Sequence, residues 1–116
     1  MMINIGKLEE FDKDLRRLSK KYRTLDKDIE VLGMVLKTNP DANPAFSFRI
    51  EGLGIETCVI KVKKIASRSF KGKGVQSGFR LVYAYFEQEG RIVYIELYHK
   101  SEKANEDRAR IKRHFK

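Results

Sequence analysis

Apolar residues in the first third of the chain recur at helical spacing. Residues 7–22 carry apolar side chains at steps of three and four, which is typical of one helix face: Leu8, Phe11, Leu15, Leu18 and Tyr22. A second set follows at the same spacing after Thr24, a residue expected to cap the helix: Leu25, Ile29, Leu32, Val35 and Leu36. The two segments predict a helical hairpin, preceded by a short edge strand at residues 2–5. Prolines and asparagines in residues 38–46 end it.

After residue 56 the apolar period changes from nearly four to two, which predicts strands. Residues 56–66 alternate, with Ile60 and Val62 on one face and Lys61 and Lys63 on the other. Residues 78–87 and 91–99 form two long apolar runs around the turn "QEG" and predict a β-hairpin. Because both runs are apolar on both faces, we expect one face to pack on the helices. The other face is expected to line a shallow groove or receive a partner.

Residues 101–115 predict a last helix, capped by Ser101. Its apolar residues are few, namely Ala104, Ile111 and Phe115, so it is expected to pack loosely or detach. With no internal repeat or linker, residues 1–116 read as one domain of the α+β class.

The charge of the chain limits the classes of partner that we expect it to bind. The chain has 25 Lys and Arg against 16 Asp and Glu, a net charge of +9, which favours a polyanionic partner. The excess is local, because residues 61–80 hold seven cations and no carboxylate. Nucleic acid is the leading class of partner. No apolar run reaches the length of a membrane span and no signal peptide precedes the domain, so we expect a cytoplasmic protein that does not bind membranes.

The strand ends bring together groups suited to phosphodiester chemistry. Lys61 and Lys63 share a strand face, Arg80 opens the next strand, and His99 with Lys100 closes the last. Because paired antiparallel strands begin and end at the same edge, Arg80 and His99 are expected to be neighbours. Cations can stabilise the charge of a pentacoordinate phosphate while a histidine moves protons. In the alternative interpretation, the lysines only keep a strand edge in solvent and the histidine is a structural hydrogen-bonding residue.

These residues also carry a resemblance. The elements are, in order, a short strand, a helical hairpin, "IKVKKIA", a basic loop, "SGFRLVYAY" and "IELYHKSEKANEDRARIK". Over nearly the whole chain, this order resembles the RelE/ParE superfamily of bacterial type II toxins. The most specific part is "SGFRLVYAY", followed after a turn by "VYIELYHKSE". The resemblance implies a helical hairpin packed on a small, mainly antiparallel twisted sheet, with a C-terminal helix.

The resemblance also implies an activity. RelE-like members are metal-independent, ribosome-dependent mRNA endoribonucleases that leave 2′,3′-cyclic phosphate and 5′-hydroxyl ends. Other members poison DNA gyrase, and most are silenced by a cognate antitoxin. The implied partners are thus an antitoxin, the ribosome and mRNA, with no cofactor and no metal. In the alternative, the chain is a ParE-like toxin that binds gyrase and cleaves nothing.

Carried onto this sequence, the RelE-like pattern implies a catalytic set of five residues: Lys61, Lys63, Arg80, His99 and Lys100. Lys100 stands where the pattern prefers arginine, and the pattern's downstream tyrosine has no counterpart in "KANED". We therefore expect His99 or a lysine of lowered pKa to act as the base, and Tyr98 to point to the opposite face from His99. The expected RNA-binding cations lie outside this set: Lys64, Arg68, Lys71, Lys73, Arg108, Lys112 and Arg113.

Overall fold

The computed structural model describes residues 2–116, and within them the chain forms three α-helices and one five-stranded sheet. The helices are α1 (Glu9–Ser19), α2 (Leu25–Thr38) and α3 (Arg108–His114). The strands are β1 (Asn4–Lys7), β2 (Ser47–Arg49), β3 (Cys58–Val62), β4 (Phe79–Phe86) and β5 (Arg91–His99). A 3₁₀ turn, Glu87–Glu89, joins β4 to β5. The α+β class predicted from the sequence is confirmed.

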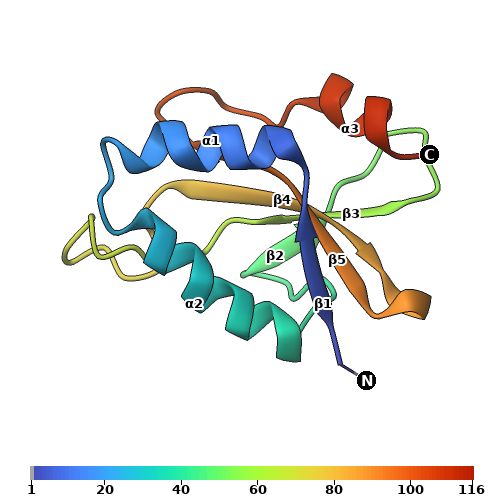
Figure 1. Cartoon of the computed structure of the whole chain (residues 1–116), viewed down its shortest axis with the longest axis horizontal. Helices are drawn as coiled ribbons and strands as arrows, with labels where there is room; N and C mark the ends of the chain where they lie inside the picture. Colours follow the sequence, from blue (N-terminus) through green and yellow to red (C-terminus); the bar gives the residue numbers. More distant parts are fainter. Residues whose placement is uncertain (1) are drawn as a thin grey trace.

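The sheet has the order β1-β5-β4-β3-β2 (Figure 1). Strands β2 to β5 pair antiparallel, whereas β1 pairs parallel to β5 at the far edge. The hairpin expected from residues 78–99 is therefore the centre of the sheet, flanked by β1 on one side and β3 on the other. β2 is the second edge strand, and its pairing with β3 was not predicted.

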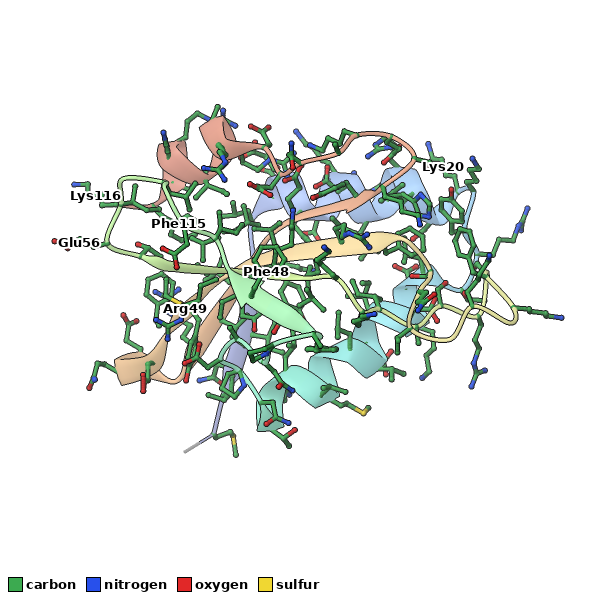
Figure 2. The ribbon with its side chains drawn as sticks, turned by 180° about the vertical axis from the view of Figure 1, so that it is seen from behind. Lys20, Phe48, Arg49, Glu56, Phe115 and Lys116 are labelled. Carbon is green, nitrogen blue, oxygen red and sulfur yellow. The ribbon has the colours of Figure 1, made fainter. Side chains whose placement is uncertain are left out.

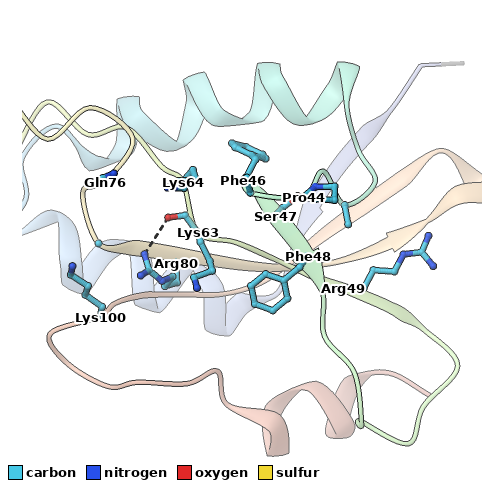
Figure 3. Close-up of a pocket in the computed structure, with 13 residues that line it drawn as sticks. Pro44, Phe46, Ser47, Phe48, Arg49, Lys63, Lys64, Gln76, Arg80 and Lys100 are labelled. Atoms are coloured by element: carbon cyan, nitrogen blue, oxygen red, sulfur yellow. Dashed lines mark hydrogen bonds between the residues drawn. The ribbon is translucent and has the colours of Figure 1, made fainter.

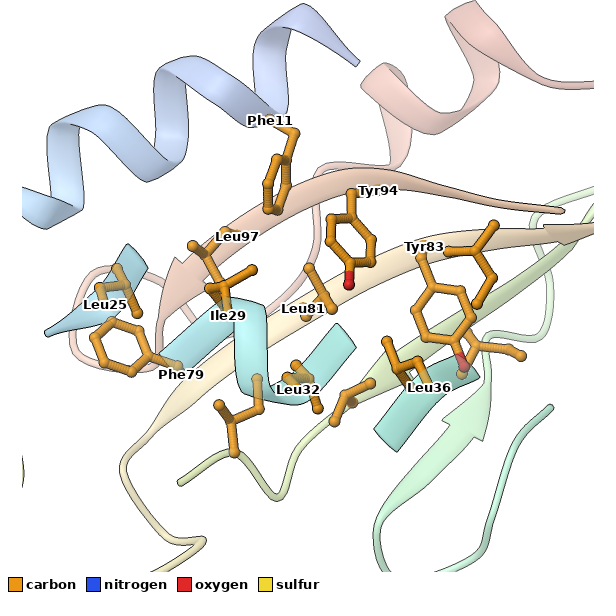
Figure 4. Close-up of a cluster of buried hydrophobic side chains, with 14 of the residues drawn as sticks. Phe11, Leu25, Ile29, Leu32, Leu36, Phe79, Leu81, Tyr83, Tyr94 and Leu97 are labelled. Carbon is orange, nitrogen blue, oxygen red and sulfur yellow. The ribbon is translucent and has the colours of Figure 1, made fainter. Parts of the chain in front are cut away.

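Helices α1 and α2 cover one face of the sheet and enclose the main core (Figure 4). Phe11 of α1 and Leu25 and Leu36 of α2 are almost completely buried there, as the helical spacing predicted. Two details of the hairpin prediction are wrong. Val35 is exposed, and Thr24 occupies the N-cap position without a capping hydrogen bond, because its hydroxyl donates to Asp28 instead.

Most of the opposite face of the sheet is covered as well, so the hairpin strands do not line an open groove along their length. Val82, Ile95 and Tyr98 pack there against Leu53 and against Ile111 of α3, forming a second apolar cluster. α3 is shorter than predicted, because residues 101–107 form an irregular segment. The cap is not Ser101 but Asp107, whose side chain accepts a hydrogen bond from the Arg110 backbone NH.

An irregularity in the β4–β5 pairing anchors the segment that leads into α3. Val82 pairs with Glu96 but Tyr83 pairs with Tyr94, which leaves Ile95 as an extra residue in β5. Glu96 is buried, accepts a hydrogen bond from the Asp107 backbone NH at 2.8 Å and also binds Lys103. The buried carboxylate thus fixes residues 103–107 against the sheet.

Among residues 2–116, the three helices are all too short or too polar to cross a membrane.

Candidate functional site

A basic groove opens at the β2 edge of the sheet (Figure 3). It has a volume of about 600 Å³ and is lined by residues from the segment before β2, from β2 itself and from the ends of β3, β4 and β5. Four cations predicted to act on RNA line it: Lys63, Lys64, Arg80 and Lys100. These four residues and the space between them are called the basic groove.

Strand pairing explains why cations distant in sequence meet in the groove. Val62 pairs with Leu81, so Lys63, the residue directly after β3, comes to lie beside Arg80. The Arg80 guanidinium donates to the Lys63 and Phe79 carbonyl oxygens, both at 3.2 Å, which fixes it at the entrance of β4. Lys100 follows β5 directly, and its backbone NH donates to the Gly78 carbonyl oxygen at 2.9 Å. Three strand ends therefore converge.

The charge of the groove is not neutralised by the chain itself. Within residues 2–116, none of the four cations forms a salt bridge, and the groove lining contains no carboxylate. Cations in a concave, partly apolar surface attract polyanions more strongly than the same charges spread over a convex one. The groove is thus suited to bind phosphate groups.

Lys61 lies beside the groove but is held in a buried ion pair. Its ammonium donates to Glu106 at 2.8 Å and to the Tyr98 hydroxyl at 3.2 Å, and both charged side chains are at most 9% exposed. Burial opposes the charge on Lys61, but these hydrogen bonds outweigh it and hold its pKa above the ordinary value. The expectation of a lysine base with lowered pKa is therefore wrong for Lys61.

His99 does not join the basic groove. Phe79 pairs with His99 and Arg80 pairs with Tyr98, so Arg80 and His99 project from opposite faces of the sheet. The imidazole is buried and stacks on Tyr22 and Phe70, with ring centroids 5.6 and 5.2 Å away. The expected cluster of Lys61, Lys63, Arg80 and His99 is therefore not formed, although Tyr98 does face away from His99 as predicted.

The hydrogen bonds of His99 indicate a structural role. Its Nε2 atom lies 2.9 Å from the Ser77 carbonyl oxygen, and its Nδ1 atom lies 2.8 Å from the Ser101 hydroxyl. Gly78, with a φ of +95°, passes so close that a Cβ atom there would lie 2.7 Å from Nε2. Both ring nitrogens are engaged, so the imidazole connects the basic loop to the end of β5.

The remaining predicted RNA-binding residues are dispersed. Arg68 and Lys71 line a separate hollow of about 500 Å³ between the basic loop and α2, and Lys73 is exposed on the same loop. Two cations near the C-terminus are already paired, Arg108 with Glu106 and Arg113 with Glu10. Lys112 is exposed, and no carboxylate in residues 2–116 pairs with it. α3 therefore offers less free charge than its sequence suggests.

Residues before β3 also contribute to the groove, although they were not predicted from the sequence. Phe46, Phe48 and Arg49 line it, with Phe48 and Arg49 lying on the edge strand β2 (Figure 2). The alternation in "FSFRI" was the available signal. The two prolines shortly before it, Pro40 and Pro44, favour a loop and obscure this alternation.

Within residues 2–116, no three His, Cys, Asp or Glu side chains lie close enough together to hold a metal ion. The single cysteine, Cys58, is half-buried at the start of β3, and burial raises the pKa of its thiol. This thiol is thus poorly suited to act as a nucleophile.

Comparison with known proteins identifies the fold. The chain is similar to a chain in the crystal structure of the archaeal RelE–RelB complex from Pyrococcus horikoshii OT3, with a TM-score of 0.57 and 15% sequence identity. The chain has a RelE-like fold. The match covers 89% of this chain and 100% of the RelE–RelB chain. No family model and no curated protein sequence matches the chain.

Proposed function

We propose that this chain, with residues 1–116 as a single domain, is the toxin of a type II toxin–antitoxin system and cleaves mRNA on the ribosome. The observation that carries the proposal is the convergence of Lys63, Arg80 and Lys100 in a groove within a RelE-like fold. The similar archaeal structure is itself a complex of RelE with RelB, which supports a cognate antitoxin as a partner.

The groove supports a reaction that depends mainly on charge. The 2′-hydroxyl of the mRNA attacks the adjacent phosphorus and the bond to the 5′-oxygen breaks, which leaves a 2′,3′-cyclic phosphate and a 5′-hydroxyl. Arg80 and Lys63 stabilise the extra negative charge on the phosphate oxygens. Lys100 gives a proton to the departing 5′-oxygen. The 2′-hydroxyl proton passes to solvent, since Lys61 and His99 are engaged elsewhere. No metal ion is assigned a role.

A second candidate function is favoured by one observation. Neither His99 nor Lys61 is available as an acid or base in the groove, so the same cations also suit a surface that only binds. In that case the chain is a ParE-like toxin that inhibits DNA gyrase.

The test is primer extension on mRNA from cells that briefly express the chain or a variant. The wild type is expected to produce discrete cleavages in translated messages only. Arg80→Ala is expected to reduce them about 100-fold or more, because it removes a donor to the charged transition state.

The matched control is Lys37→Ala, which removes one exposed cation of α2 outside the groove and is expected to leave cleavage unchanged. Thermal melting of both variants checks that the fold is intact. Uncleaved messages in arrested wild-type cells, together with inhibition of gyrase supercoiling by the pure chain, would favour the second function.

A further inference from the structure

The basic groove contains an exposed aromatic ring that the proposed chemistry does not use. Phe48 is 42% exposed on the edge strand β2. The other exposed large apolar side chains in residues 2–116 are aliphatic: Met2, Val31, Met34, Val35 and Val75. Leaving a phenyl ring in water forgoes the free energy of its burial, so its position in a charged groove requires an explanation.

The surroundings of Phe48 are cationic. Phe48 pairs across the strands with Lys61, and the two side chains therefore project from the same face of the sheet. The Lys61 and Lys63 ammonium groups lie 5.5 and 5.6 Å from the ring centroid. Figure 3 shows Phe48 and Lys63 in the same groove. Lys61 is tied to Glu106, whereas Lys63 is exposed and free to turn toward a ligand.

An aromatic ring beside unpaired cations matches the chemistry of single-stranded nucleic acid. Phosphate groups bind the cations, and an unstacked base lies on the ring. A duplex offers no free base face at such a site, because its bases stack on one another. The short distance from the ring to Lys63 allows one nucleotide to contact both.

We propose that Phe48 is the stacking platform for one unpaired base of the RNA strand bound in the basic groove. The inference rests on the proposed function and restricts its substrate to a single-stranded segment. Phe48 acts as a positioning residue: it holds the base while the neighbouring phosphate lies against Lys63 and Arg80.

The absence of tryptophan from the sequence allows a direct test. Phe48→Trp introduces a single indole, whose fluorescence is quenched when a base stacks on it. The probes are a short single-stranded RNA and the same oligonucleotide with abasic residues, each non-cleavable through 2′-O-methyl groups. The control is Phe86→Trp at the far end of β4, six residues and about 20 Å from Arg80.

Quenching of Phe48→Trp by the intact RNA, with little quenching by the abasic one and none in Phe86→Trp, is the expected result. Fluorescence anisotropy gives a second readout. Phe48→Leu keeps the apolar bulk and is expected to weaken binding of intact RNA about tenfold while leaving abasic RNA unaffected.

Two outcomes overturn the inference in different ways. If the wild type binds RNA but Phe48→Leu weakens intact and abasic RNA equally or not at all, stacking is refuted and the proposed function stands. If the wild type binds neither RNA even at low salt, the inference fails. The proposed function fails with it only when the primer-extension test also shows no cleavage, and a protein partner then becomes the occupant of the groove.

Discussion

Lys61 shows how burial can change the role of a single residue. A strand lysine beside a basic groove has the sequence signature of a catalytic group, yet its ammonium is enclosed by Glu106 and Tyr98. Glu106 in turn accepts from Arg108 at 3.1 Å. Burial disfavours the Glu106 carboxylate, but the hydrogen bond from Lys61, a backbone hydrogen bond and the charges of Lys61 and Arg108 together outweigh it and lower the carboxyl pKa. Lys61 therefore holds residues 103–107 against the sheet.

We predict that Glu106→Gln lowers the free energy of unfolding by about 3 kcal/mol, because it leaves the Lys61 ammonium buried without a counter-charge. Urea denaturation measures this. The control is Glu102→Gln, which breaks the exposed ion pair with Arg17 and is expected to cost less than about 1 kcal/mol. Equal losses in the two variants would show that the buried pair contributes no more than a surface one.

α3 is the element whose packing differs most from what its sequence predicts. Its few apolar residues suggested loose packing, but Ile111 is fully buried in the second cluster. Arg110 donates to Asp14 of α1 at 2.7 Å, so α3 is held by charge as well as by apolar contact. A helix of seven residues is too short to be stable alone, and its docking depends on these tertiary contacts.

Ile111→Ala is accordingly predicted to destabilise the protein by about 3 kcal/mol through the cavity it creates. In the Ile111→Ala variant, amide hydrogen exchange should be faster in residues 103–114 than in β4. The control is Lys112→Ala, which alters the exposed side of the same helix. Its free energy of unfolding should change by less than about 0.5 kcal/mol. Unchanged exchange in Ile111→Ala would mean that the ion pairs alone hold α3.

The spacing of apolar residues and the distribution of charge were sufficient to predict the helical hairpin and the strands β3, β4 and β5, because each of these elements has its own local pattern. The face of the sheet from which each site residue projects could not be predicted in the same way. Whether His99 or Tyr98 shares a face with Arg80 depends on the β4–β5 register. The partner of Lys61, Glu106, lies 45 residues away in an irregular segment. Such long-range pairings leave no periodic trace in a single sequence.

At the scale of the whole molecule, ionisation sets a pH range of stability. The pKa values of Glu10, Asp41 and Glu106 are all lowered by partners in the fold. Carboxyl groups with lowered pKa stabilise the folded state above their ordinary value near 4.5 or 3.8, and this contribution is lost as the pH falls through the folded values. Burial raises the pKa of Tyr94 from 10.0 to about 12, so its contribution is lost as the pH rises through that interval.

We therefore predict a plateau in the urea midpoint between about pH 6 and 9, with a fall on either side. Tyr94→Phe removes one buried ionisable hydroxyl and should reduce the alkaline fall while leaving the acid one unchanged. An alkaline fall of the same size in Tyr94→Phe would assign it to other groups, such as Tyr83, whose pKa is also raised by burial.

The pairing of β1 with β5 affects how the chain can be made. Asn4 lies opposite Arg91, so the first strand has no partner until residues 91–99 have left the ribosome. The main core needs side chains from both ends of the chain, including Phe11 and Leu97. During synthesis, the N-terminal helices therefore cannot complete their packing until the later strands are made, because the strand pairing is non-local. The basic groove, which needs Lys100, is likewise completed only after residue 100 has been synthesised. A half-made chain therefore lacks the assembled basic groove.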